Sequence, residues 1–167
     1  MYDKLLITSW TKYIHRMFEH SFSKNWYETY WAIDMHRTLI KPTYDLNDKS
    51  LHFYPFALET MQLLTNRDDI KTIMWTSSYP QEIEEYVRQL SIGGVEFDNI
   101  NENPDISSNN GNFGFYEKKF YFNIIIDDKA AFDPETDWEP IYNLFMEYKK
   151  NNFLESSTLK SYSVHLL

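Results

Sequence analysis

The segment that decides the fold is residues 30–40, which read YWAIDMHRTLI. Its first four residues are apolar and typical of a buried β-strand, and polar and ionisable side chains then begin abruptly at Asp34. A carboxylate at the end of a buried strand is costly to desolvate unless a ligand or a reaction uses it. We therefore predict a first core strand over residues 29–34, with Asp34 and His36 as candidate functional residues at its end.

Strand-like and helix-like segments alternate along the rest of the chain. The predicted helices span residues 54–64, 79–94 and roughly 137–149, and the further predicted strands span residues 72–75, 95–97 and 120–126. This alternation predicts an α/β domain with a mainly parallel central sheet and helices on both faces, which is a three-layer, Rossmann-like arrangement. In such sheets ligands bind beyond the carboxyl ends of the strands.

The chain divides into three predicted regions: an amphipathic helix within residues 1–27, a core over residues 28–150 and a tail over residues 151–167. Apolar side chains between residues 5 and 18 recur at helical spacing, so the first helix is expected to pack on the core or to form a homodimer contact. The turn-rich residues 41–49 predict an exposed loop or small flap.

Composition excludes several classes of function. A chain of 167 residues fits one domain, and the absence of cysteine excludes disulfides, thiolate metal sites and cysteine nucleophiles. The net charge of −9 argues against a broad nucleic-acid surface, which needs clustered lysine and arginine. The sequence shows no signal-peptide pattern. It also has no apolar run as long as the roughly 18 residues that a membrane-spanning helix needs. The expected location is the cytoplasm, without membrane contact.

Polar residues follow three of the predicted strands at the point where each strand ends. Asp34 ends the first, Thr76 and Ser77 follow the second, and Asp127 and Asp128 follow the last. Carboxylates suit Mg²⁺, while a threonine hydroxyl, backbone N–H groups and a lysine can hold a phosphate. A carboxylate that faces phosphorus can attack it as a nucleophile, giving an aspartyl-phosphate that water then hydrolyses.

These segments resemble, in order and spacing, the motifs of the haloacid dehalogenase (HAD) superfamily of aspartate-nucleophile phosphatases. That family's first motif is an apolar strand followed by D-x-D-x-[TV], which WAIDMHRTLI matches at Asp34 and Thr38. Its second motif is an apolar strand ending in Thr or Ser, matched by IMWTSS at Thr76. The resemblance covers about residues 28–132.

The family's last two motifs are a lysine and an acidic pair after a strand. NIIIDD matches the acidic pair, and Lys119 lies eight residues before Asp127, with Lys118 as the alternative. The segments between the motifs are too short for a large cap domain. Family members without a cap typically have an open site that suits a bulky substrate or is closed by a partner chain.

The resemblance implies a role for each matched residue. The nucleophile and a metal ligand would be Asp34, the phosphate-binding residues Thr76, Ser77 and Lys119, and the other Mg²⁺ ligands Asp127 and Asp128, directly or through water. Lys119 would also act in catalysis, by orienting the phosphoryl group and screening its charge. Which carboxylate of the acidic pair contacts the metal directly stays open at this point.

Two residues depart from the family pattern. Arg37 replaces a common glycine, so the turn must tolerate a side chain. His36 replaces the second aspartate, which is the family's usual general acid/base and gives the metal its backbone carbonyl. An imidazole, with an unperturbed pKa of about 6.5, can do acid–base work near neutral pH. His36 is therefore a candidate catalytic residue, and its carbonyl a candidate metal ligand.

Two functions from different classes follow from this pattern. The first is a Mg²⁺-dependent phosphate monoester hydrolase that acts through an aspartyl-phosphate on Asp34, with a phosphorylated substrate of unknown type. The second is a catalytically impaired protein that binds phosphoryl groups or another ligand as a regulatory module, because His36 replaces the acid/base aspartate. An unrelated nucleotide-binding domain is less consistent with the sequence, since none of its four glycines forms G-x-G-x-x-G.

Overall fold

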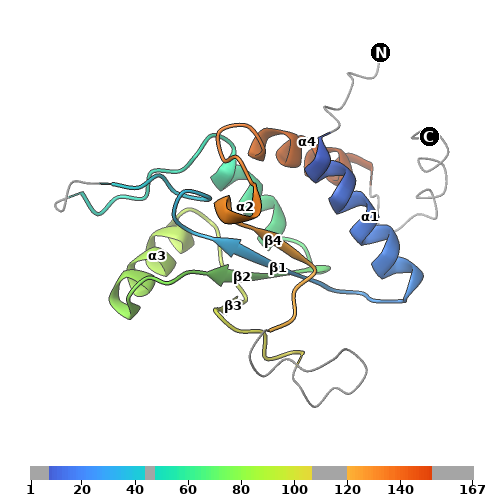
Figure 1. The fold of residues 1–167 in the computed structure, drawn as a ribbon, viewed down its shortest axis with the longest axis horizontal. Helices are drawn as coiled ribbons and strands as arrows, with labels where there is room; N and C mark the ends of the chain where they lie inside the picture. Colours follow the sequence, from blue (N-terminus) through green and yellow to red (C-terminus); the bar gives the residue numbers. More distant parts are fainter. Residues whose placement is uncertain (1–7, 44–47, 107–119, 152–167) are drawn as a thin grey trace.

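The computed structural model describes residues 8–43, 48–106 and 120–151. These residues form an α/β fold around a four-stranded, all-parallel sheet in the order β3-β2-β1-β4 (Figure 1). The strands are β1 (Thr29–Asp34), β2 (Ile70–Trp75), β3 (Asn99–Ile100) and β4 (Ile124–Ile126). The helices are α1 (Ser9–Ser23), α2 (Ala57–Thr65), α3 (Pro80–Ile92) and α4 (Trp138–Asn151), with a short 3₁₀ helix, η1 (Asp128–Ala130), directly after β4.

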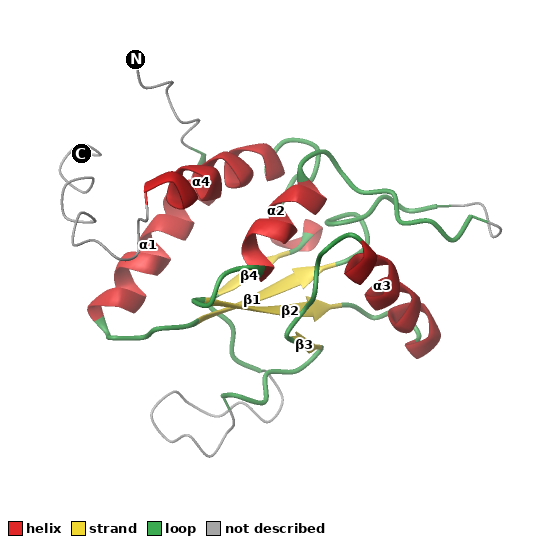
Figure 2. Cartoon of the chain, turned by 180° about the vertical axis from the view of Figure 1, so that it is seen from behind, coloured by secondary structure: helices red, strands yellow, loops and turns green. Residues whose placement is uncertain are grey.

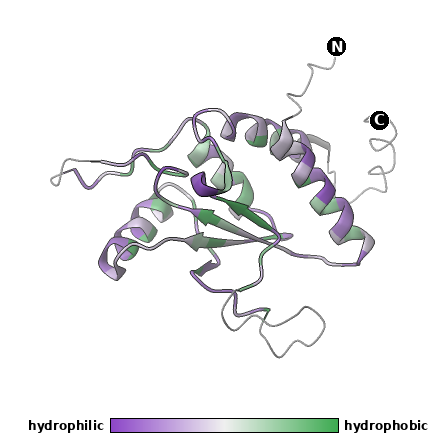
Figure 3. Ribbon diagram, viewed as in Figure 1, coloured by the Kyte–Doolittle hydropathy of each residue, from purple (hydrophilic) through white to green (hydrophobic). Residues whose placement is uncertain are grey.

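β1 is a central strand, as its continuous apolar sequence predicts. It pairs with β2 over its whole length, so that Asp34 lies opposite Trp75, and with β4, where Ile33 lies opposite Ile126. The residues that end or follow these three strands therefore meet at one edge of the sheet. Figure 3 shows β1 and β4 in hydrophobic colours and the hydrophilic η1 immediately beyond β4.

One face of the sheet packs against the helices and forms the main core. Trp31 and Ile33 of β1 belong to this core, and Trp31 contacts Phe18 of α1 and Phe145 of α4. In Figure 2, α1, α2 and α4 lie above the sheet, and α3 joins the same core through Tyr86 and Leu90.

On the opposite face lie the two described ends of the connection from β3 to β4. They run below the sheet in Figure 2, where Tyr121 packs on Tyr30 and Phe120 packs on Trp75. The parallel sheet thus lies between two layers, which confirms the predicted three-layer, Rossmann-like α/β arrangement. The expected helices on the second face are not found among the described residues, because α1, α2, α3 and α4 all contribute to the core on one face. Residues 107–119 lie outside the described part of the chain.

The connections between the strands are short where they are described. The link from β1 to β2 holds a loop and α2, and the link from β2 to β3 holds α3, so neither contains a cap domain within the described residues. The segment at residues 41–49, predicted as an exposed loop or small flap, is a loop in its described parts, with residues 41–43 and 49 exposed, and these parts extend away from the sheet (Figure 1). Gln89 of α3 holds the base of this loop, because its side chain donates to the carbonyl of Lys49 at 2.6 Å and accepts from the N–H of Leu51 at 3.0 Å.

α1 packs on the core, which is one of the two roles predicted for residues 1–27. The hydroxyl of Thr8 caps the helix by accepting a hydrogen bond from the N–H of Thr11 at 3.2 Å. Ile14, Met17 and Phe18 are buried on the inner face of the helix. A dimer contact through its outer face stays a prediction.

Three predicted strands differ from the structure. β2 begins at Ile70, two residues before the predicted strand 72–75. Residues 95–97 are not a strand, because the N–H of Val95 closes the end of α3 on the carbonyl of Leu90, and pairing with β2 starts only at Asn99. The predicted strand 120–126 is reduced to Ile124–Ile126. Before Ile124, the side-chain oxygen of Asn123 accepts a hydrogen bond from the N–H of Tyr30 at 2.8 Å. In regular strand pairing, a backbone carbonyl would accept this hydrogen bond.

Across the described ranges of the chain, none of the helices combines the length and the apolar character that a membrane crossing requires. Asn151 ends α4, and the rest of the predicted tail lies outside the described residues.

Candidate metal and phosphate site

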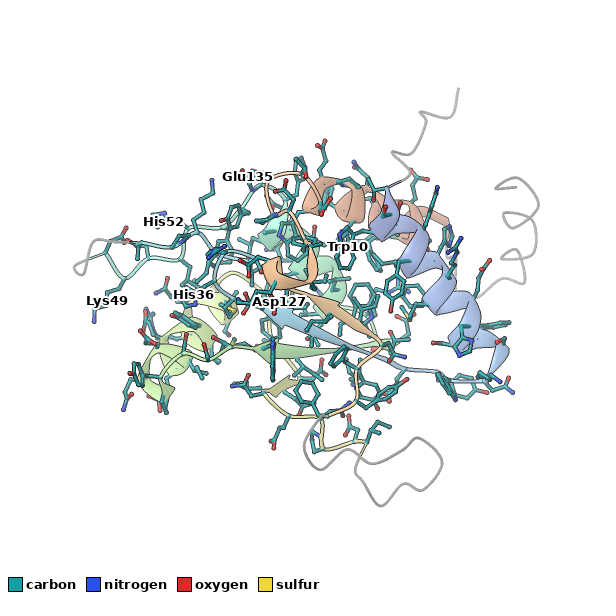
Figure 4. All side chains as sticks on the ribbon, viewed as in Figure 1. Trp10, His36, Lys49, His52, Asp127 and Glu135 are labelled. Carbon is teal, nitrogen blue, oxygen red and sulfur yellow. The ribbon has the colours of Figure 1, made fainter. Side chains whose placement is uncertain are left out.

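Three carboxylates meet at the carboxyl edge of the sheet. Asp34 ends β1, and Asp127 and Asp128 follow β4, which is the neighbouring strand. One oxygen atom from each carboxylate lies within 4.8 Å of the other two. Oxygen ligands so arranged suit Mg²⁺, which usually takes one or two carboxylates and keeps several waters. The three predicted carboxylate ligands are thus brought together, and Figure 4 places Asp127 and His36 at this edge.

Thr38 organises the carboxylates from the buried side. Its hydroxyl donates to Oδ2 of Asp34 at 3.1 Å and accepts from the N–H of Asp128 at 2.9 Å. Its carbonyl accepts from the indole N–H of Trp138 at 2.9 Å. One fully buried side chain therefore ties the end of β1 to the loop after β4 and orients the carboxylate of Asp34.

The turn after β1 is closed by its own backbone. The N–H groups of Leu39 and Ile40 both donate to the carbonyl of Met35, at 3.0 and 2.9 Å. Arg37 has a φ of 62°, in the left-handed region that costs a non-glycine residue roughly 1–2 kcal/mol. The turn thus tolerates a side chain where the resembling family has glycine, at an energetic cost.

Two cations lie against Asp128. The guanidinium of Arg37 is 2.9 Å from Oδ2 of Asp128, and the ammonium of Lys129 is 3.0 Å from Oδ1. Both cationic side chains are mostly exposed, at 69% and 77%. They partly balance the charge of the acidic cluster, and a metal ion at Asp128 would compete with them.

The pKa values of the cluster reflect these surroundings. Burial raises the pKa of Asp34 and the charge of Asp127 adds to this, although the hydrogen bond from Thr38 opposes it. Burial also acts to raise the pKa of Asp128, but the hydrogen bond and charge of Lys129, with the charge of Arg37, lower it overall. The pKa of Lys129 is raised by its hydrogen bond to Asp128 and by the carboxylate charges.

Thr76 lies in a fixed loop at the same edge, directly after β2. The side chain of Asn101 accepts from the N–H of Thr76 and donates to its carbonyl, each at 2.8 Å. The hydroxyl of Thr76 donates to Oγ of Ser78 at 3.1 Å and accepts from the N–H of Ser78 at 3.2 Å. Ser77 is exposed on this loop. The N-cap of α3 is Tyr79, so none of these three hydroxyl residues serves as that cap.

His36 is exposed, and its ring is held from α3. Its Nε2 is 3.1 Å from the hydroxyl of Tyr86, and the two rings meet edge to face with centroids 5.6 Å apart. Tyr86 is buried in the core, and its hydroxyl is also 3.5 Å from Oγ of Ser78. Tyr86 therefore links His36, which follows the end of β1, to the loop that follows β2.

The predicted phosphate-binding Lys119, and its alternative Lys118, lie outside the described residues. The next residue, Phe120, packs its ring on Trp75 with centroids 5.2 Å apart, and Trp75 lies opposite Asp34 in the sheet. The described chain thus resumes close to the site.

Three residues of the site were not predicted. Lys129 had a local signal, because it directly follows the acidic pair. Asn101 and Tyr86 carried no such signal, since each reaches the site only through the packing of β3 or α3.

Comparisons with known proteins support the fold and leave the chemistry open. No family model and no curated protein matches the chain. A solved structure of a conserved protein coded by a locus from Bacteroides thetaiotaomicron is similar, with a TM-score of 0.53 and 24% sequence identity. The match covers 78% of this chain and 99% of that one. A likeness at this level of identity extends to the α/β fold alone.

Proposed function

We propose that this chain is a Mg²⁺-dependent phosphate monoester hydrolase of the HAD type, acting through an aspartyl-phosphate on Asp34. The observation that carries the proposal is the cluster of three carboxylates within 4.8 Å, in which Thr38 orients Asp34. Thr76, held by Asn101 directly after the adjacent strand β3, supports a phosphate site beside this cluster.

In the first step, one oxygen of Asp34 attacks phosphorus while the bond from phosphorus to the ester oxygen breaks. Asp127, Asp128, the second oxygen of Asp34 and the carbonyl of His36 would hold Mg²⁺, which when bound neutralises charge on the phosphoryl oxygens. Ser77 donates a hydrogen bond to the phosphoryl group, and the hydroxyl of Thr76 would do so by turning its proton from Ser78 to a phosphoryl oxygen. Lys119 is assigned the same task.

His36 handles the protons in this proposal. Its imidazole protonates the leaving oxygen in the first step and takes a proton from the attacking water in the second. That water attacks phosphorus, which releases inorganic phosphate and restores Asp34. The position of His36 two residues after Asp34, at the open edge of the sheet, supports this role.

A second function, a phosphoryl-binding regulatory module with little turnover, is favoured by one observation. Nε2 of His36 lies against the hydroxyl of Tyr86, so Nδ1 alone is left for proton transfer at a position where the resembling family has a carboxylate. In that case Mg²⁺ and phosphate would still bind at the carboxylates and Thr76.

Hydrolysis of p-nitrophenyl phosphate, with and without Mg²⁺, tests the proposal in the native chain, Asp34→Asn and His36→Asp. We expect Mg²⁺-dependent release of phosphate that Asp34→Asn abolishes and that the exposed control Asp133→Asn retains. Equal activity in the native and Asp34→Asn chains would contradict the mechanism. An inactive native chain with an active His36→Asp variant would favour the regulatory module.

The substrate stays unassigned among phosphorylated metabolites, nucleotides and phosphoproteins. A cytoplasmic location and a homodimer through α1 also belong to the proposal. Cell fractionation would test the location, and light scattering of the purified chain would test the dimer.

A further inference from the structure

A line of hydroxyl groups joins the loop after β2 to His36. The hydroxyl of Thr76 donates to Ser78 at 3.1 Å, and that of Ser78 donates to the hydroxyl of Tyr86 at 3.5 Å. The hydroxyl of Tyr86 then meets Nε2 of His36 at 3.1 Å. Four side chains from three different segments are thereby linked in one row.

Tyr86 is the fixed member of this row. It points into the core from the second turn of α3, and Leu90, four residues later on the same face of the helix, is buried with it. His36, in contrast, is an exposed side chain on a tight turn. An exposed imidazole can occupy several rotamers, which place Nε2 at different points, and holding it in one of them requires a partner.

We propose that Tyr86 is a positioning residue, whose hydroxyl holds the imidazole of His36 in the orientation that proton transfer at Asp34 requires. This inference rests on the proposed hydrolase function. Because Thr76 and Ser78 stand at the other end of the row, the orientation of His36 is also tied to the loop that would hold the phosphoryl group. Tyr86 itself touches neither the substrate nor the metal in this role, because its hydroxyl, among the described residues, contacts only the ring of His36 and the hydroxyl of Ser78.

Tyr86→Phe tests the proposal, because it keeps the ring in the core and removes only the hydroxyl. Tyr148→Phe is a matched control, since the hydroxyl of Tyr148 meets Nδ1 of His15 at 3.1 Å in the distant contact between α4 and α1. We expect kcat of Tyr86→Phe to fall about threefold to tenfold, the equivalent of one net hydrogen bond, with KM unchanged. Tyr148→Phe should keep the native kcat.

The His36→Asp background separates positioning from packing. A carboxylate at that position is too short to reach Tyr86, so adding Tyr86→Phe to His36→Asp should change kcat no further. An equal loss of kcat in the native and His36→Asp backgrounds would overturn the proposal, because Tyr86 would then act through the core.

NMR of the His36 side chain gives a readout that does not depend on activity. We expect its χ1 couplings to indicate one rotamer in the native chain and averaging in Tyr86→Phe. If no chain hydrolyses a phosphate monoester, the proposed function is wrong, and the couplings still test the contact. Averaged couplings in Tyr86→Phe would then support the inference that Tyr86 holds the ring of His36. Couplings equal to those of the native chain would overturn that inference.

Discussion

The carboxyl group of Asp34 lies where burial disfavours its charge more than its neighbours favour it, so its pKa is raised. Burial and the charge of Asp127 raise its pKa above the ordinary aspartate value, and Thr38 offsets only part of this. The folded pKa therefore exceeds the unfolded one, so ionised Asp34 destabilises the fold at neutral pH. This cost is relieved as the pH falls through the folded pKa. A site that binds a cation is expected to carry such a cost.

Asp34→Asn should therefore stabilise the metal-free chain. An amide oxygen still accepts the hydrogen bond of Thr38, and the buried charge is gone, so we expect Tm at neutral pH to rise by about 1–3 °C in differential scanning fluorimetry. Added Mg²⁺ should raise Tm of the native chain and leave that of Asp34→Asn unchanged. A lower Tm for Asp34→Asn without metal would contradict this explanation of the pKa.

Arg37 combines a strained backbone with an ion pair at a proposed metal ligand. Arg37→Gly relieves the positive φ, but it loses the ion pair between the exposed guanidinium and Asp128 and adds freedom to the unfolded chain. These effects oppose each other, so the free energy of unfolding should change little. Loss of a competing cation should tighten Mg²⁺ binding about threefold in isothermal titration calorimetry. Weaker binding would mean that Arg37 is needed to orient Asp128.

At the scale of the elements, the bounds of a strand were predicted correctly where its local apolar pattern matches its pairing in the sheet. The strand at residues 29–34 was predicted with its observed bounds because its apolar run reflects burial on both faces. The bounds of β3 and β4 were predicted wrongly because single side chains determine where strand pairing begins. The carboxylate of Asp98 accepts a hydrogen bond from the N–H of Thr72 just before β3, and the side-chain oxygen of Asn123 accepts one from the N–H of Tyr30 just before β4. No local pattern reveals such contacts.

Asn101 stabilises the loop after β2 in the same way, through side-chain hydrogen bonds to the backbone of Thr76. Asn101→Ala should lower Tm by several degrees, because it removes two hydrogen bonds worth about 1 kcal/mol each and leaves a non-glycine residue at a φ of 55°. Asn101→Gly removes the same bonds without the strain and should lose less. Thermal unfolding of both variants checks this order, and a larger loss for glycine would contradict it.

The contact between α1 and α4 should make stability depend on pH. Burial lowers the pKa of His15 from its ordinary value of 6.5, although Glu19 opposes the shift. The unfolded chain then binds the proton more readily than the folded chain. The stabilising contribution of neutral His15 is therefore full above the ordinary pKa of 6.5 and is lost as the pH falls below it. We expect Tm to drop between about pH 7.5 and about pH 5.5, and His15→Phe to reduce the drop. The exposed His20→Gln serves as the control, and an unchanged drop in His15→Phe would contradict the assignment.

At the scale of the whole molecule, parallel topology explains why so much of the site could be predicted. Once three strands are parallel neighbours, the residues that end or follow them must share one edge, and Asp34, Thr76 and Asp127 do so. Tyr86 could not be predicted in the same way. It ends the segment EIEEY, which is typical of a charged helix face, and only the docking of α3 on the core turns this tyrosine toward His36.

The central claim is that Asp34 is the nucleophile. A crystal structure of the chain with Mg²⁺ and beryllium fluoride, a mimic of a phosphoryl group, tests it most directly. We expect the beryllium to be joined to a carboxylate oxygen of Asp34, with Mg²⁺ held between Asp34 and the pair Asp127–Asp128. Beryllium fluoride held at Thr76 with no bond to Asp34, or Mg²⁺ absent from the three carboxylates, would contradict the claim.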